Sequence, residues 1–450
     1  MKASIGEYAP SKLEILRTVR RHGRLGLMQH IWRSGGDLTH VRLGSRAFFM
    51  VVHPEHVRHI SVTQRQKYEK RQSYQLARDL LLGHGLLTSN GEEWRRQRKL
   101  MAPFFTPRGV EKYYPIMVAD TQRFIERWRT LQGTGRPVEM IDEMMLLTAH
   151  VIVHCLFSTE SDETLLSVKG AVETMIGFVS NRGASSFKLP LWLPTPGNLR
   201  FHRARKLVNT YIRQVIAQRR AQPPEQWPED LLTKMMVTPD EETGTVMSEQ
   251  LLLDNGITMF FAGHETTART MTFLWYAVSQ HPEVEARLHA ELDAVLGEAP
   301  PTLEDLRKLP YTLQVIKEVL RLYPAAPVYV RDAIVEDELE GVRIPVGSRM
   351  LLFPYATHRH PGFWDEPERF DPDRWLPERE AERDPHAYHP FAAGQRICVG
   401  NNFSLLETHL LTAMLLRRFK ARVVPGHQPR IDSAGTLVVR NGIPMLLEAR

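Results

Sequence analysis

Hydrophobic residues recur along most of this chain at spacings of three and four, which is the period of a helix with one buried face. Polar and charged residues fill the positions between them, so we expect the helices to pack around a shared core. The pattern predicts helices at residues 92–100, 116–131, 138–156, 163–179, 200–222, 248–280, 282–296, 311–323 and 402–419.

Strand-like segments occur near the beginning of the chain and again in its last third. Residues 38–43 and 48–52 flank the turn residues 44–45, which predicts a β-hairpin. Residues 328–353 form a second strand-like region with glycine turns, and a closing pair of strands is expected around Gly442. We therefore expect a mainly α fold of the α+β class, with a large helical body and a small, largely antiparallel β-sheet subdomain.

Length and composition favour one globular domain over residues 1–450, because the chain has no internal repeat, low-complexity tract or long polar linker. Its 42% hydrophobic and 24% charged residues exclude disordered, collagen-like and coiled-coil proteins. The two cysteines, Cys155 and Cys398, are too few for a disulfide framework and suit a reducing compartment.

Charge and hydropathy limit the surroundings of the protein. The apolar stretches are shorter than the roughly 20 residues that cross a bilayer, and arginines interrupt residues 1–32, where a signal peptide would be apolar. We expect a cytoplasmic protein without a transmembrane span, and a peripheral membrane contact stays open. The formal charge of +6 comes from interspersed basic and acidic residues, and no basic run with aromatic residues indicates nucleic-acid binding.

An apolar segment with three prolines, residues 189–196, cannot form a regular helix and should be a loop between two helices. Two interpretations remain open for it. The loop either packs on the core or forms the lip of a hydrophobic substrate entrance.

Cys398 is the strongest candidate for chemistry. It stands between glycines, which allow the backbone to approach a flat ligand closely, and just before the predicted helix at 402–419. Arg396 and the free N–H groups of that helix are expected to lower the pKa of the thiol, so that Cys398 serves as an anionic metal ligand. No second cysteine or histidine stands at zinc spacing, and Cys155 lies in an apolar predicted helix as an inert thiol. A single thiolate ligand suits haem.

The segment 391–400 fits the pattern FxxGxRxCxG, which resembles the haem-binding loop of the cytochrome P-450 family. By chance, such a pattern should occur in roughly one chain in ten thousand of this length. The resemblance covers essentially the whole chain and implies the cytochrome P-450 fold, haem b as cofactor and Cys398 as the iron ligand. The positions that match are Phe391, Gly394, Arg396, Cys398 and Gly400.

Other motifs of the family occur in the expected order. Glu318 and Arg321 form the ExxR motif, and residues 367–370 (PERF) follow. ExxR occurs elsewhere in the chain, so only its position before the cysteine loop selects this copy. We expect the Glu318 carboxylate to accept hydrogen bonds from both Arg321 and Arg369 and so to brace the Cys398 loop. The alternative is a surface ion pair.

The predicted helix at 248–280 contains the sequence AGHETT, which is similar to the oxygen-activation segment of the family. Ala262 and Gly263 are expected to leave room over a flat cofactor. Glu265 and Thr266 are expected to deliver protons, while the resemblance assigns His264 no ligand role and we treat it as structural. Taken alone, such a stretch would more often mark a helix kink.

Cations should also converge on the two propionates of a haem. By similarity to the family these are Trp94 and Arg98 on one helix, Arg331 after the ExxR helix, and Arg396 beside the cysteine. For each arginine the alternative is a solvated surface position.

The resemblance implies a monooxygenase that inserts one oxygen atom of O2 into a hydrophobic fatty acid, terpenoid or carotenoid. Residues 73–82, 189–196 and 325–329 are expected near this substrate. We expect a monomer that takes electrons from a separate ferredoxin or flavodoxin with its reductase. A peroxide-driven peroxygenase and a non-catalytic haem sensor are the alternatives, and the Glu265-Thr266 pair argues against both. A positive patch is expected to dock the donor, formed by Arg95, Arg96, Lys99, Arg417, Arg418 and Lys420.

Overall fold

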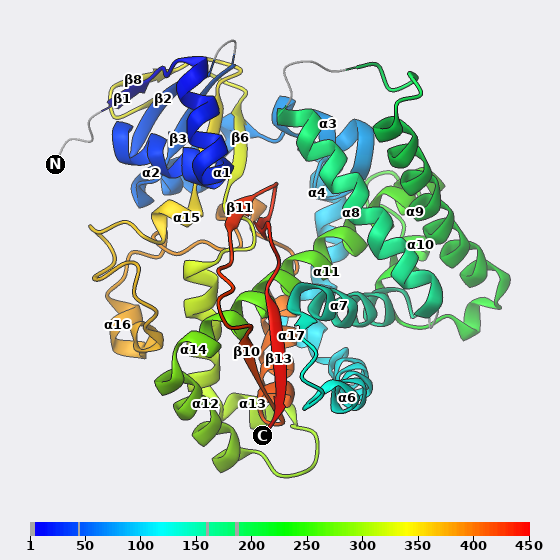
Figure 1. Ribbon diagram of the computed structural model, residues 1–450. Coiled ribbons are helices and arrows are strands. Elements are labelled where there is room, and N and C mark those ends of the chain that lie inside the picture. Colours follow the sequence, from blue (N-terminus) through cyan, green and yellow to red (C-terminus); the bar gives the residue numbers. More distant parts are fainter. Residues whose placement is uncertain (1–4, 44–45, 159–161, 185–188) are drawn as a thin grey trace.

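The computed structural model (Figure 1) describes the chain apart from residues 1–4, 44–45, 159–161 and 185–188. The expected hairpin turn at 44–45 therefore lies outside the described residues, although its two strands do not. The fold class is as predicted: a large helical body stands beside a smaller lobe rich in strands.

The long helices of the body coincide with the predicted ranges to within a few residues. They are α4 (Gly91–Met101), α6 (Tyr114–Leu131), α7 (Met140–Phe157), α8 (Asp162–Ala184), α9 (Pro196–Ala221), α11 (Glu249–Gln280), α12 (Pro282–Val295), α14 (Pro310–Leu322) and α17 (Asn401–Leu416). Shorter helices are α2 (Pro54–Arg58), α3 (Gln72–Ala77), α5 (Pro107–Glu111), α10 (Leu231–Val237), α13 (Leu303–Arg307), α15 (Pro354–Thr357) and α16 (Pro377–Ala381).

Helix α11 is the central helix of the helical body. Ser248 caps its N-terminus by accepting a hydrogen bond from the Leu251 N–H at 3.2 Å, and its 32 residues correspond to about 48 Å of helix. Most of its side chains are buried, and α7, α9, α14 and α17 pack around it. Helix α7 is the one described helix long and apolar enough to cross a membrane, but 72% of its residues are buried inside the protein, as in a core helix.

One long helix was not predicted. Helix α1 (Lys12–Gly35) contains arginines at five positions and a break at Gly23, whose φ is +73°. Its buried side chains all follow this break, so the hydrophobic period is too short to be recognised in the sequence.

The strands of the described residues form four sheets. The largest has the order β1-β2-β3-β9-β6-β4, and it is mixed because β1–β2 and β3–β9 are parallel pairs. The early hairpin is confirmed as β2 and β3, whereas the expected closing pair around Gly442 is wrong: β12 pairs with β11, and β13 pairs with β10 and β5. The strands are β1 (Ile5–Tyr8), β2 (Leu38–Leu43), β3 (Arg46–Val51), β4 (Tyr68–Glu69), β5 (Val138–Glu139), β6 (Tyr329–Ala333), β7 (Asp337–Leu339), β8 (Val342–Ile344), β9 (Arg349–Leu352), β10 (Phe419–Val423), β11 (Ile431–Ser433), β12 (Leu437–Val439) and β13 (Pro444–Ala449).

Candidate active site

The Cys398 loop is a tight turn that ends at the first residue of α17. The Ile397 N–H donates to the Gly394 carbonyl at 3.0 Å, and the Cys398 N–H donates to the Phe391 carbonyl at 2.9 Å. Gly394 has φ +69°, and a Cβ there would lie 1.8 Å from the Ser61 carbonyl oxygen. Only glycine fits this position. A Cβ on Gly400, by contrast, would meet nothing within 4 Å.

The Cys398 thiol is accessible, yet burial is the largest influence on its pKa and raises it. A thiol that is both accessible and surrounded by protein lies at an internal site. The Gly400 N–H at the start of α17, Arg98 and Lys70 each act to lower this pKa. The predicted net lowering of the pKa is therefore wrong for the protein without a ligand, and Arg98 and Lys70 take the place expected for Arg396. Cys155 is buried with a pKa raised well above its usual value, as an inert thiol should be.

Three of the predicted cofactor-binding side chains meet around this loop. Arg98 donates from Nη1 to the Ile397 carbonyl at 3.0 Å. The Arg396 guanidinium lies 3.8 Å from the ring centroid of Trp94, and its Nη2 donates to the Ser89 carbonyl at 3.0 Å. The i, i+4 spacing of Trp94 and Arg98 on α4 thus places both beside the cysteine loop, as predicted.

Several positively charged side chains lie close together beside the Cys398 loop. Burial, Arg331 and Arg98 lower the pKa of Arg396 to about 9. Burial, Arg331 and Arg396 similarly lower the pKa of Lys70 well below its usual value. Lys70 was not predicted from the sequence, because a lone lysine after a short strand carries no motif.

This cation cluster (Lys70, Arg98, Arg331 and Arg396) fits the anionic edge of a cofactor. Arg331 is 3% exposed, and Nη1 of Arg396 is buried without a hydrogen-bond partner among the described residues. Buried cations that repel one another are costly unless an anion joins them. The two propionates of a haem would supply that charge beside the thiolate ligand Cys398, so the donor set fits this group.

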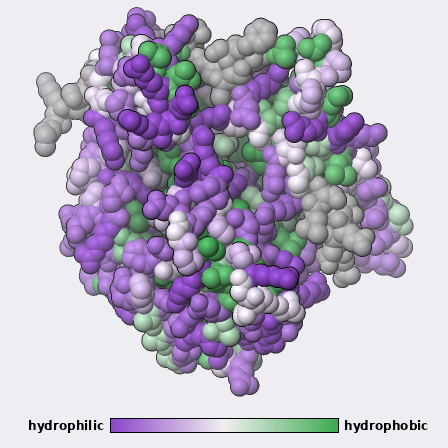
Figure 2. Space-filling model, in the orientation of Figure 1, coloured by the Kyte–Doolittle hydropathy of each residue, from purple (hydrophilic) through white to green (hydrophobic). Residues whose placement is uncertain are grey.

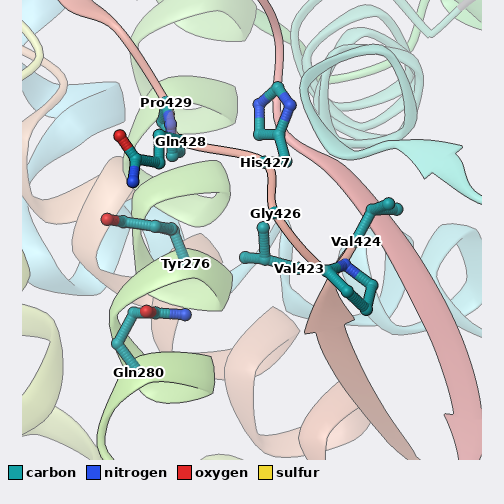
Figure 3. Close-up of a pocket in the computed structure, with 9 residues that line it drawn as sticks. Tyr276, Gln280, Val423, Val424, Gly426, His427, Gln428 and Pro429 are labelled. Atoms are coloured by element: carbon teal, nitrogen blue, oxygen red, sulfur yellow. The ribbon is translucent and has the colours of Figure 1, made fainter.

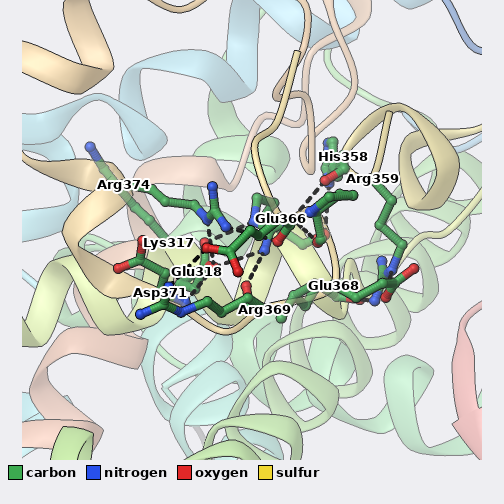
Figure 4. A network of polar contacts seen from close by, with 12 residues as sticks. Lys317, Glu318, His358, Arg359, Glu366, Glu368, Arg369, Asp371 and Arg374 are labelled. Carbon is green, nitrogen blue, oxygen red and sulfur yellow. Dashed lines mark hydrogen bonds and ion pairs between the residues drawn. The ribbon is translucent and has the colours of Figure 1, made fainter. Parts of the chain in front are cut away.

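A buried network around Glu318 braces the segments behind the loop (Figure 4). Glu318 and Arg321 are both 0% exposed, and two hydrogen bonds of 2.8 Å join them. Arg321 also donates to the carbonyls of His358 and Pro367, at 2.8 and 2.7 Å. The ExxR motif is therefore an internal brace and not a surface ion pair.

The predicted role of Arg369 is wrong. Its side chain is 63% exposed and pairs with Glu366, and only its carbonyl oxygen joins the network, accepting from Arg321 at 2.9 Å. Arg374 lies in its place, with Nε 3.5 Å from the Glu318 carboxylate. The Trp375 indole N–H donates to the same carboxylate at 3.0 Å. These residues follow the PERF motif, whose arginine side chain lies at the surface and pairs with Glu366.

Two histidines connect the brace to the cysteine loop. Nδ1 of His358 lies 3.1 Å from the Arg321 carbonyl, and its Nε2 accepts from the His389 N–H at 2.9 Å. The His389 carbonyl then accepts from the Ala392 N–H at 3.1 Å, inside the loop. Burial lowers the pKa of His389 to about 3 and that of His358 well below its usual value. Both rings are therefore neutral at pH 7.

The AGHETT segment lies in the middle of α11. The Thr266 hydroxyl donates to the Ala262 carbonyl one turn earlier, at 2.8 Å, and both residues are only partly buried within a mostly buried stretch. A Cβ on Gly263 would lie 2.4 Å from Cδ1 of Ile152, so the space that this glycine leaves is taken by α7. His264 is buried, with Nδ1 2.6 Å from the Phe260 carbonyl, in agreement with a structural role.

Glu265 is buried and turned away from Thr266. Its Oε1 accepts from the Thr436 hydroxyl at 2.8 Å and lies 3.3 Å from Nη2 of Arg269. Its Oε2 is buried without a partner among the described residues. No direct hydrogen bond joins the predicted acid and alcohol in this part of the chain, since neighbouring side chains on a helix diverge by about 100°.

The substrate segments differ in exposure. The loop at 189–196 joins α8 to α9, and Trp192 within it is 80% exposed. Leu191 of the same loop packs against the core, so the loop combines a packed side chain with an exposed one and both interpretations stay open. Figure 2 shows apolar residues over the top of the molecule, on either side of a hollow between its two lobes. A separate open pocket of about 440 Å³ lies between Tyr276 and Gln280 of α11 and residues 423–429 (Figure 3), and it contains none of the predicted site residues.

The expected docking patch is partly neutralised. Arg95 pairs with Glu92, Arg96 lies 3.9 Å from Asp240, and Lys99 pairs with Glu241. Arg418 is partly buried and donates to the Met414 and Glu298 carbonyls. Acidic residues of the loop before α11 thus lie beside the cations of α4 and offset part of their charge.

Comparison with known proteins gives a consistent result. The family model described as Cytochrome P450 matches residues 10–447. The chain is 36% identical over 392 residues to a cyclooctat-9-en-7-ol 5-monooxygenase from Streptomyces melanosporofaciens, which covers 87% of this chain and 84% of the relative. It is 32% identical over 416 residues to a pentalenene oxygenase from Streptomyces avermitilis, covering 92% and 91%.

Solved structures show the same fold. The haem domain of cytochrome P450DA superposes with a TM-score of 0.88 at 24% identity, over 100% of this chain and 99% of that one. A cyanobacterial CYP120A1 with retinoic acid bound superposes with a TM-score of 0.85 at 25% identity, over 96% of each chain.

Proposed function

Because this chain belongs to the cytochrome P450 family and is a monooxygenase that uses haem iron and O2, we propose that it oxidises a terpenoid with electrons from a separate redox partner. The observation that carries the site assignment is the accessible Cys398 thiol beside a cluster of four cations, of which Lys70 and Arg331 are buried. We propose that the cofactor is haem b, with Cys398 as iron ligand and Lys70, Arg98, Arg331 and Arg396 around its propionates.

When bound, haem iron with a thiolate ligand supplies the activation of O2 and the cleavage of the O–O bond. The chain supplies the surroundings. The cation cluster orients the propionates, the Glu318–Arg321 brace fixes the loop that presents Cys398, and Trp94 stacks on Arg396 at its edge.

Two residues of α11, Thr266 and Glu265, provide the path for protons. The Thr266 hydroxyl, bonded to the Ala262 carbonyl, keeps an oxygen lone pair and is placed to hold a water molecule at the partly accessible face of the helix. Glu265 has one free oxygen, Oε2, through which it can accept and release a proton. Because the two side chains diverge, we propose that water connects them.

The substrate class rests on the relatives. Two of them carry terpenoid oxidation in their names and cover more than four fifths of this chain. The exposed Trp192 on the loop between α8 and α9 supports an apolar entrance for such a molecule. We further propose a cytoplasmic monomer whose donor is a ferredoxin or flavodoxin, docking on the face behind Cys398.

The test is turnover of the purified holoenzyme on a panel of cyclic sesquiterpenes and diterpene alcohols, with ferredoxin, its reductase, NADPH and isotopically labelled O2. We expect one labelled oxygen atom in the product and a substrate-induced shift of the haem absorption. Equal turnover with peroxide alone, and product without label from O2, would replace this proposal with a peroxygenase. Oxidation of fatty acids in place of every terpenoid would overturn the substrate class only.

A further inference from the structure

The predicted proton-delivering acid is held by a residue far away in the sequence. Glu265 lies in the middle of α11, whereas Thr436 lies in the turn between β11 and β12. The 2.8 Å hydrogen bond from the Thr436 hydroxyl to Oε1 is partly buried. The AGHETT motif contains no signal for this contact.

The turn is built to present this hydroxyl. Gly435 has φ +102°, a conformation that residues with a side chain rarely adopt. The Ala434 N–H donates to the Thr436 carbonyl at 2.9 Å, which closes the turn and leaves the Thr436 side chain for Glu265.

The hairpin is anchored on both sides of this turn. The Leu437 N–H donates to the Ala325 carbonyl at 2.9 Å, in the segment 325–329 that is expected near substrate. On the other strand, Asp432 accepts from the Leu25 N–H of α1 at 2.9 Å and pairs with Arg440. In Figure 1, β11 lies close to α1, between the strand-rich lobe and the helical body. The hairpin therefore joins the acid to two elements outside α11.

The contact also decides which oxygen of the acid is free. Thr436 and Arg269 both engage Oε1, and Oε2 is left buried without a described partner. A glutamate on a helix has several staggered side-chain positions, and ordering one of them costs conformational entropy. Two donors on the same oxygen select one orientation of the carboxylate.

We propose that Thr436 is a positioning residue that holds Glu265 with Oε2 free for proton transfer, and that the β11–β12 hairpin links this orientation to the substrate-facing segment at Ala325. This inference rests on the proposed monooxygenase function. A substrate that displaces residues 325–329 would move the Leu437 anchor, and through it the donor on Oε1.

The test compares Thr436→Val, which removes the hydroxyl but retains the shape, with Thr436→Ser, which retains the hydroxyl. Thr272→Val is the matched control, because the Thr272 hydroxyl is buried on the same helix and donates only to the Ala268 carbonyl, at 2.7 Å. We expect Thr436→Val to release at least about threefold more hydrogen peroxide per electron, with unchanged substrate affinity and a larger solvent isotope effect on product formation. Thr436→Ser should restore the parent values, and Thr272→Val should keep them.

A second measurement tests the contact without turnover. In a double-mutant cycle, Thr436→Val and Glu265→Leu, each of which removes one partner of the hydrogen bond, are combined in the ferric holoenzyme, and unfolding by denaturant is followed. A hydrogen bond to a charged group predicts a coupling of about tenfold in the unfolding equilibrium constant. Coupling close to zero, or failure of Thr436→Ser to rescue, would overturn the proposal. A parent enzyme that forms no product with O2 would instead refute the proposed function, and the cycle would still report on the contact.

Discussion

The two faces of the site are built differently. Behind Cys398, buried charges hold the chain: Glu318 and Arg321 bond to each other, and Arg321 bonds to the backbone of the loop that follows α15. On the substrate side, the contact between α8 and α9 includes the stacked rings of Phe178 and Phe201, 4.4 Å apart, and the loop between these helices exposes Trp192. The difference indicates that directional bonds fix the region behind Cys398, whereas apolar packing holds α8 and α9, on the side proposed to receive the substrate.

The largest effect should come from breaking the brace. Arg321→Met removes a fully buried cation and leaves the Glu318 charge without its partner, which should cost about 3–5 kcal/mol of stability. We expect loss of haem retention in purified protein, measured as the ratio of haem to polypeptide. Arg369→Ala, which removes an exposed side chain from the same region, should cost no more than about 1 kcal/mol. If both variants retained haem equally, the network would not be what fixes the loop.

Removing the Thr266 hydroxyl should lower the yield of product per electron without affecting folding. Thr266→Ala deletes the hydroxyl that donates to the Ala262 carbonyl, and we expect product per electron consumed to fall about tenfold or more. Substrate affinity and haem content should stay at parent values, because the hydroxyl braces no other element of the described chain. Product and peroxide are quantified against NADPH consumed. Unchanged coupling would mean that Glu265 and water suffice.

Acid should destabilise the fold, in part through two histidines of the braced side. His358 and His389 are neutral in the fold, with pKa values below the usual value near 6.5, and for His389 at about 3. At pH values between the lowered pKa of each histidine in the fold and about 6.5, the unfolded chain binds protons that the folded chain does not. The free energy of unfolding should therefore fall as the pH drops below about 6.5, by up to about 1.4 kcal/mol per pH unit for each histidine.

Denaturant unfolding at pH 7 and pH 5 measures this slope. His389→Asn should flatten it in part, because one of the suppressed titrations is gone, while other buried histidines such as His289 and His409 still contribute. An identical slope in the variant and the parent would show that other groups control the response to acid.

The smallest effect on stability is expected on the substrate side. Trp192→Ser replaces a side chain that is 80% exposed, so the free energy of unfolding should change by no more than about 0.5 kcal/mol. Substrate affinity, read from the shift of the haem absorption, should weaken nevertheless if the loop forms the entrance. A loss of stability like that of Arg321→Met would remove the contrast between the two faces.

The sequence predicted the elements whose signals are local. The long helices follow from hydrophobic period, and the Cys398 loop follows from its motif, with Gly394 explained by a close approach to Ser61. The pairing of strands that lie far apart in the sequence was harder to predict. The partners of β12 and β13 depend on where the chain places β5, β10 and β11, and sequence spacing does not contain that information.

The site residues divide in the same way. Trp94, Arg98 and Arg396 come together as predicted, because a helix and a tight loop fix their relative positions. Arg369 was assigned the place that Arg374 occupies, since choosing between two nearby arginines requires knowing which one the folded loop buries. Lys70 and Thr436 were missed because each acts through a contact with a distant segment.

We propose that Cys398 holds the iron of a haem through its sulfur. The absorption spectrum of the reduced protein with carbon monoxide tests this, recorded for the parent and for Cys398→Ser, with Cys155→Ala as control. We predict the band typical of a thiolate ligand in the parent and in Cys155→Ala, and its loss in Cys398→Ser. An unchanged band in Cys398→Ser, or its loss in Cys155→Ala, would contradict the assignment.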